Sequence, residues 1–268
     1  KETVGPRAVV AETHAKIAHG KLVGTGKLDV EGLARLEITR AELDLPRLDG
    51  RSLQRATGTV ELRGSIDLAQ GIPFFTSERI ERTSGIATVE ARIERGDPEA
   101  LPAVRGTVRT RGLEVVLAGG SRSEPVVVSG VDLLAHAEWD GRTEDAEVSL
   151  LGWDEHGVLA SGAVKSKLPL RWVTDTKSLD ATALGSLAIG AVLDVPRRDL
   201  TALPPLLRAK ELRGGVDAHV RVTGTVARPL VELRAQIAGL DEVRRSQGVA
   251  TFEPLDGVLH GRWDGERA

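Results

Sequence analysis

The sequence predicts an all-β protein, built as a long, twisted, mainly antiparallel sheet that curls into an open hydrophobic groove and carries one short helix. Three observations predict the antiparallel sheet: apolar and polar residues alternate along most of the chain, Asp-Gly turn dipeptides recur, and two distant parts of the chain resemble each other. The open groove is favoured because helices and large aromatic side chains that could cover the apolar face are scarce. Aromatic residues make up only 3% of the 268 residues. Apolar burial must therefore come from Val, Leu, Ala and Ile, whose β-branched members favour strands.

The alternation places apolar side chains on one face of each strand and polar side chains on the other. A sheet with one polar face is typical of antiparallel pairing, because parallel sheets are covered on both faces and read as continuous apolar runs. We expect the apolar face to be formed by Val60, Leu62, Ile66, Leu68, Leu187, Ile189, Leu193, Val216, Ala218, Val220, Val222, Val231, Leu233, Ala235 and Ile237.

Turn residues separate the alternating segments. Asp-Gly supplies the positive φ angles that tight hairpins need, and Gly157, after a run of polar residues, indicates a slightly longer hairpin. The Asp-Gly pairs expected at hairpin tips are Asp49-Gly50, Asp140-Gly141, Asp256-Gly257 and Asp264-Gly265.

One helix is expected, from Asp199 to Ala209, where leucines recur near helical spacing. Pro204 and Pro205 would shorten or kink it. A single short helix cannot cover the apolar face of so many strands.

An internal repeat links the two halves of the chain. The segments beginning at Gly85, Pro102 and Trp139 resemble those beginning at Gly215, Pro229 and Trp263, at offsets of 215−85=130, 229−102=127 and 263−139=124. We therefore expect one continuous repeating β-groove over residues 1–268, with approximate repeat units at 36–141 and 187–265. The interrupted second copy predicts a larger array.

Composition argues against several function classes. The 36 basic and 39 acidic residues are spread evenly, so no basic stripe indicates nucleic-acid binding. Cysteine is absent, which excludes disulfides and thiolate chemistry. The six histidines form no His-Glu-x-x-His pattern, and Asp154, Glu155 and His156 are expected at a hairpin tip, where polar residues are usual. We expect no enzyme, no metal and no cofactor.

The stretch from Leu212 to Leu240 resembles the TamB and AsmA-like families of bacterial envelope proteins. The likeness lies in a strand ending at Gly224-Thr225, a short turn, and Pro229 opening the next strand; the segment Leu36 to Pro46 is similar to another of their recurring strands. The resemblance implies a periplasm-spanning protein, anchored in the inner membrane through a segment outside this sequence. It also implies a β-groove that carries phospholipids toward the outer membrane, in some members with an outer-membrane β-barrel partner.

Two functions from different classes follow. In the first, the chain is a non-enzymatic phospholipid conduit whose apolar face holds acyl chains, since helices and large aromatic fillers that could cover that face are scarce. In the alternative, it is a structural or adhesive β-solenoid or β-sandwich array with a self-packed interior and no lipid. The Trp-Asp-Gly segments at Trp139 and Trp263 are expected to pack over turns, and a sugar-stacking role is the weaker interpretation.

Overall fold

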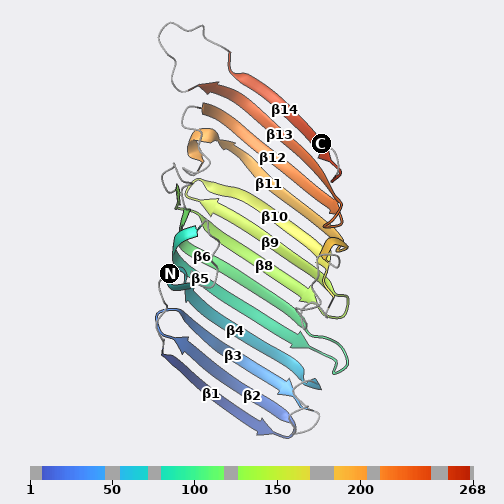
Figure 1. Ribbon diagram of the computed structural model, residues 1–268. Coiled ribbons are helices and arrows are strands. Elements are labelled where there is room, and N and C mark those ends of the chain that lie inside the picture. The colour runs from blue at the N-terminus through green and yellow to red at the C-terminus, as the bar shows by residue number, and fades with distance from the viewer. Residues whose placement is uncertain are drawn as a thin grey trace.

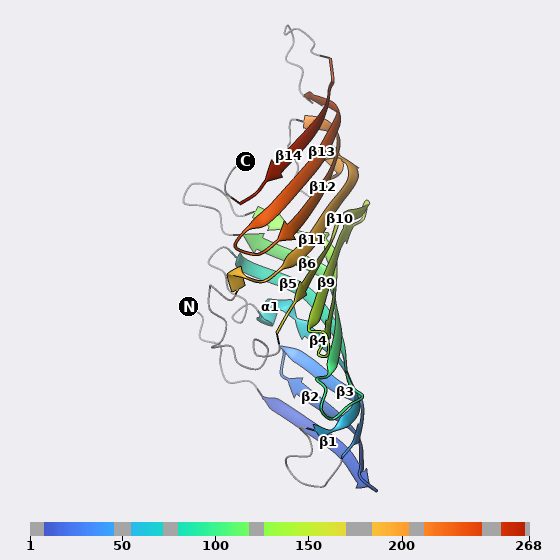
Figure 2. The same ribbon diagram turned by 90° about the vertical axis from the view of Figure 1, so that its right-hand side faces the viewer.

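The computed structural model describes residues 8–45, 55–71, 80–117, 126–169, 184–203, 212–242 and 253–265. They form one antiparallel sheet whose strands follow each other in chain order, except that β7 pairs with β6 outside the main path. The sheet is twisted and does not close on itself: β1 and β14 lie at its opposite ends (Figures 1 and 2). The predicted all-β, antiparallel, open sheet is confirmed.

Most strands are long, and successive strands of the main path run antiparallel, in an up-and-down order. In chain order the elements are β1 (Val9–Ala18), β2 (Lys21–Val30), β3 (Ala34–Asp44), β4 (Thr57–Asp67), α1 (Leu68–Gly71), β5 (Ile80–Arg95), β6 (Ala103–Leu117), β7 (Val126–Val128), β8 (Asp132–Asp140), β9 (Asp145–Asp154), β10 (Gly157–Lys167), β11 (Ile189–Asp199), η4 (Leu200–Ala202), β12 (Leu212–Gly224), β13 (Pro229–Glu242) and β14 (Leu255–Trp263).

The register aligns apolar residues across the whole sheet. Residues that pair directly across antiparallel strands point to the same face, so chains of paired residues trace rows that cross every strand on the main path. Neither of two such rows contains a charged residue. One row is Thr13, Gly26, Ile38, Leu62, Ala91, Gly106, Ala137, Val148, Val164, Ala191, Val222, Val231 and Trp263; the other is Ala11, Leu28, Leu36, Gly64, Val89, Val108, Ala135, Leu150, Gly162, Leu193, Val220, Leu233 and Gly261. We call the face that carries them the apolar face.

The opposite side, here called the polar face, carries charges that alternate in sign near both ends of the sheet. Opposite charges on neighbouring strands attract each other and help to fix the register. One row there reads Glu12, Lys27, Glu37, Arg63, Glu90, Thr107, His136, Ser149, Ala163, Val192, Arg221, Glu232 and Arg262.

Some of the predicted hairpin tips are turns in the structure, and one is not. The turn after Asp140 joins β8 to β9, and Gly157, with φ +111°, closes the hairpin between β9 and β10, so both positions are confirmed. The hairpin at Gly157 is shorter than predicted, because Asp154 pairs directly with Gly157 and leaves a loop of two residues. Gly265 follows the end of β14 with φ +87°. Asp49-Gly50 lies outside the described residues. The hairpin tip at Asp256-Gly257 is wrong, because both residues lie inside β14.

Two predictions about helix and strand limits need correction. Leu68 was expected in a strand, but it begins α1, because the Asp67 carboxylate accepts a hydrogen bond from the Ala69 N–H and starts a helical turn. Leu187 also lies outside a strand: its N–H donates to the Leu184 carbonyl in a turn, and β11 begins at Ile189.

The helix expected from Asp199 to Ala209 is a short 3₁₀ turn, η4, in its described part. Asp199 caps this turn by accepting a hydrogen bond from the Thr201 N–H. Leu203 follows η4 in extended conformation, and the turn has ended there. Residues 204–209 lie outside the described residues.

The same two-glycine bulge occurs in both parts of the chain that the sequence repeat relates. In the first, Gly85 (φ +110°) lies against Gly112 (φ +63°), whose N–H donates to the Asp132 carboxylate over 2.9 Å. In the second, Gly214 (φ +130°) lies against Gly239 (φ +63°), whose N–H donates to the Asp256 carboxylate over 2.7 Å. The repeat therefore has a structural counterpart in a two-glycine bulge closed by an aspartate, while the limits of the repeat units stay a prediction.

The described strands form a single layer with a very small core. Among the described residues, the buried apolar side chains are Ala56, Ala87, Val116 and Leu203. The chain exposes 18711 Å² of surface, whereas a compact monomer of its mass would expose about 11,000 Å². Most of the apolar face is thus not covered by another strand of the described chain.

Candidate functional site

The candidate site is the apolar face. Most of the residues that the sequence predicts for this face lie on it. All predicted residues except Leu68 and Leu187 lie on this face, in β4, β11, β12 and β13. The set in β4 and the set in β11 to β13 are far apart in the sheet. The intervening strands β5, β6, β8, β9 and β10 join them through the two uncharged rows.

Large aliphatic side chains on this face remain open to solvent. Leu193 keeps 43% of its surface exposed, Leu150 keeps 48% and Leu259 keeps 56%. Contiguous exposed apolar surface of this extent usually marks a binding site for an apolar ligand, a membrane or another protein.

Sequence reasoning missed many residues of the apolar face. The same period-two pattern was present in β6, β8, β9 and β10, but Gly and Ala interrupt the runs of large residues there and weaken the signal. The missed large side chains include Val9, Ile17, Leu28, Leu36, Ile38, Val89, Val104, Val108, Leu133, Val148, Leu150, Val164, Leu259 and Trp263.

One buried ion pair lies at the rim of the apolar face. Arg198 pairs in register with Val216, so it lies on the apolar side, at the end of β11. Its guanidinium makes two hydrogen bonds of 2.7 Å to the Asp154 carboxylate, one to each oxygen. The two side chains are only 7% and 8% exposed. A lone charge would be strongly unfavourable in this position, and the bidentate pairing neutralises it.

The electrostatics of this pair follow from its geometry. Hydrogen bonding from Arg198 lowers the pKa of Asp154 below its ordinary value, against an opposing contribution from burial. The same hydrogen bonds raise the pKa of Arg198. Both groups therefore stay ionised at neutral pH, and they tie the β9–β10 hairpin tip to β11. This is a structural role for Asp154, whose carboxylate also accepts a hydrogen bond from the His156 N–H in the turn.

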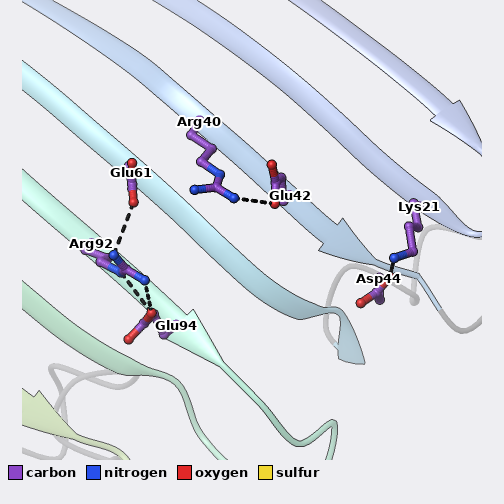
Figure 3. A network of polar contacts seen from close by, with 7 residues as sticks. All are labelled: Lys21, Arg40, Glu42, Asp44, Glu61, Arg92 and Glu94. Atoms are coloured by element: carbon purple, nitrogen blue, oxygen red, sulfur yellow. Dashed lines mark hydrogen bonds and ion pairs between the residues drawn. The ribbon is translucent and has the colours of Figure 1, made fainter.

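On the polar face, charged side chains form ion pairs within and between strands. Figure 3 shows one stretch, where Arg92 contacts Glu61 and Glu94, while Lys21 reaches Asp44. The Arg40–Glu42 hydrogen bond, drawn in the same view, lowers the pKa of Glu42. These pairs are largely exposed, so each contributes little stability, and their main effect is on strand register.

A shallow hollow of about 410 Å³ lies among these charges, lined by polar-face residues that include Arg63, Glu90, Arg105 and His136. Its arginines already have carboxylate partners: Arg63 pairs with Glu90, and Arg105 pairs with Glu138. Within the described ranges, no group of three or more His, Asp or Glu side chains is placed to hold a metal ion. Arg92, which also lines the hollow, contacts Glu61 and Glu94, so all three arginines of the lining are paired with carboxylates.

Trp139 and Trp263 occupy matching places on the apolar face, each at the end of its strand. The indole N–H of Trp139 donates to the Leu168 carbonyl over 3.2 Å. Trp153 lies on the other face, with the Arg109 guanidinium 5.6 Å from its ring centre. The chain therefore carries tryptophans on both faces of one sheet.

In the described part of the chain, no helix has the length and apolar character needed to cross a membrane. Comparisons with protein-family models, with curated proteins and with solved structures found no match to this chain.

Proposed function

We propose that the chain is a segment of a lipid conduit, in which the apolar face holds the acyl chains of phospholipids and the polar face meets water. The observation that supports this proposal is the pair of uncharged rows that cross the sheet from β1 to β14. A face of this kind must be covered, and acyl chains are an apolar material that can cover it without a specific fit.

The dimensions suit such a cargo. Neighbouring strands lie about 4.8 Å apart, so the thirteen strands of the main path give an apolar face roughly 58 Å long. One leaflet of a bilayer core is about 15 Å thick, and an acyl chain lying across the strands would therefore cover about three of them. Burying about sixteen methylenes would gain on the order of 12 kcal/mol per chain.

The chemistry of the face favours movement over tight recognition. Its side chains are mainly Val, Leu, Ile, Ala and Gly, which attract a hydrocarbon only through many weak contacts. No polar group in the two rows, apart from the Thr13 hydroxyl and the Trp263 indole N–H, offers a hydrogen bond. The face therefore holds a chain at any position along its length with similar strength. The resemblance to TamB and AsmA-like proteins supports a bacterial envelope setting, in the periplasm with an inner-membrane anchor outside this segment.

Native mass spectrometry after mild extraction, followed by lipid analysis, tests the proposal. We expect co-purified phospholipid in the unchanged protein and much less in Leu193→Asp. The matched control is Val192→Asp, because Val192 is the next residue in β11, is 39% exposed against 43% for Leu193, and lies on the polar face. Equal lipid content in both variants would refute the apolar-face assignment.

The native tryptophans give a second readout. Phospholipids with nitroxide labels on their acyl chains should quench Trp263 on the apolar face and spare Trp153 on the polar face, as judged in variants that keep a single tryptophan. A lipid-free protein whose Trp263 is shielded from solvent by another protein layer would instead favour the structural array with a self-packed interior.

A further inference from the structure

The polar face carries an apolar patch over the middle strands of the sheet, β8, β9 and β10 (Figure 1). Trp153 pairs in register with Asp132 and Val158, and Leu151 pairs with Leu134. Residues that pair directly across strands share a face, so four apolar side chains adjoin there. We call these four residues the middle patch: Leu134, Leu151, Trp153 and Val158. Val158 is 41% exposed, and the other three are half-buried.

The sequence of these strands departs from the strict alternation seen in strands such as β12. Leu133 and Leu134 follow each other in β8, and Leu150 and Leu151 follow each other in β9. Successive residues of a strand point to opposite faces, so both faces carry large apolar side chains at the same place. Continuous apolar runs are typical of strands that are covered on both faces. The middle patch is therefore a second surface that we expect to be covered, separate from the apolar face.

Two arginines of β6 border the middle patch. Arg109 pairs in register with Leu134, and its guanidinium lies 5.6 Å from the centre of the Trp153 ring. Arg111 lies two residues further along β6, so it points to the same face. Both arginines are exposed. Arg105 of the same strand pairs with a carboxylate, whereas neither Arg109 nor Arg111 forms an ion pair in the part of the chain that the structure describes.

The surroundings of these arginines favour a partner that carries carboxylates. The Asp132 carboxylate next to the patch accepts a hydrogen bond from the Gly112 N–H in the bulge of β6, and it offsets one of the two positive charges. Contact with the indole ring holds the Arg109 guanidinium in place, and its N–H groups can donate two parallel hydrogen bonds to a carboxylate. Trp and Arg are also the residue types that most often supply binding energy at protein interfaces.

We propose that the middle patch binds an acidic, aliphatic segment of another protein, whose aliphatic side chains cover the patch and whose carboxylates pair with Arg109 and Arg111. An anionic membrane surface is the competing partner. Polybasic sites that hold such membranes contain about four to eight Lys or Arg, whereas this border has two arginines and an aspartate, which favours a protein segment. The proposal concerns the polar face and does not depend on lipid binding by the apolar face.

Peptide selection tests the proposal. The probe is a random peptide library displayed on phage, which is depleted on the double variant Arg109→Gln/Arg111→Gln and then selected on the unchanged protein. Depletion removes peptides that bind elsewhere, including those that bind the apolar face. We expect the selected peptides to be rich in Asp, Glu and aliphatic residues, and to bind the double variant about tenfold more weakly than the unchanged protein. No enrichment, or selected peptides without acidic residues, would overturn the proposal.

The matched control is Arg221→Gln/Arg234→Gln. It removes two exposed arginines from the polar face of β12 and β13, away from the middle patch, and it should leave peptide binding unchanged. Circular dichroism checks that both double variants keep their strands. An equal loss of binding in the two double variants would contradict the assignment to the middle patch.

The fluorescence of Trp153 reports the contact itself. In a variant that keeps Trp153 as its single tryptophan, peptide binding should shift the emission to shorter wavelength. Emission of a fully buried tryptophan in the isolated protein would overturn the proposal, because the chain would then cover the patch by itself. Binding to phosphatidylglycerol vesicles that is lost in Arg109→Gln/Arg111→Gln would also overturn it, in favour of a membrane. The amount of co-purified phospholipid should be equal in the unchanged protein and this variant, and it reports separately on the conduit.

Discussion

At the scale of single residues, the Arg198–Asp154 pair is the contact with the largest predicted cost of removal. Arg198→Ala leaves a buried carboxylate without its partner, so we expect the free energy of unfolding to fall by about 3 kcal/mol. Urea unfolding at neutral pH measures this loss. Arg35→Ala is the control, because Arg35 pairs with Asp29 at an exposed site, and its loss should cost less than about 1 kcal/mol.

The same pair predicts a dependence on pH. The pKa of Asp154 is lower in the folded protein than in the unfolded chain. Its stabilising contribution is therefore complete above the ordinary aspartate pKa of about 3.9 and is lost as the pH falls through the lowered value. The difference in stability between the unchanged protein and Arg198→Ala should therefore be largest at neutral pH and shrink as the pH falls, since acid removes the contribution of Asp154 in the unchanged protein and neutralises its unpaired charge in the variant. A difference that is as large below about pH 4 as at pH 7 would contradict the assignment.

At the scale of elements, the two-glycine bulges predict that removing the aspartate that closes each bulge lowers the stability of the protein by a similar amount. Asp132→Ala and Asp256→Ala each remove a charged acceptor from a glycine N–H, which should cost each variant about 1 to 2 kcal/mol in urea unfolding. Asp217→Ala, on the polar face of β12, should change stability by less than about 0.5 kcal/mol. Clearly unequal effects at Asp132 and Asp256 would show that the two bulges are not structurally equivalent.

At the scale of the whole molecule, the single-layer sheet predicts that the folded protein without lipid binds the dye ANS, which reports exposed apolar surface. Adding phospholipid should displace the dye. Leu259→Asp should reduce the signal more than Val258→Asp, although the two side chains are exposed to a similar degree, 56% and 59%, because they lie on opposite faces. Equal reductions would argue that the dye does not distinguish the faces.

The sequence alone determined the fold class and the separation of the two faces. Period-two alternation is a local property, since the pleat of a strand sends successive side chains to opposite sides. The alternation in Val216 to Val222 therefore predicted both the strand and its apolar side chains without knowledge of any partner. The hairpin at Gly157 was predictable for the same reason, because a positive φ angle is a local requirement.

Only the tertiary structure decided the pairing register of the strands and the places where a local turn signal does not form a turn. Pairing register joined the β4 residues to those of β11 to β13 in one surface, and it brought Arg198 to Asp154 across 44 residues. It also placed Asp256-Gly257 inside a strand, where the Asp256 carboxylate closes the bulge at Gly239. Such contacts depend on the pairing register between strands, which bulges and long connections shift and which the alternation within one strand does not specify.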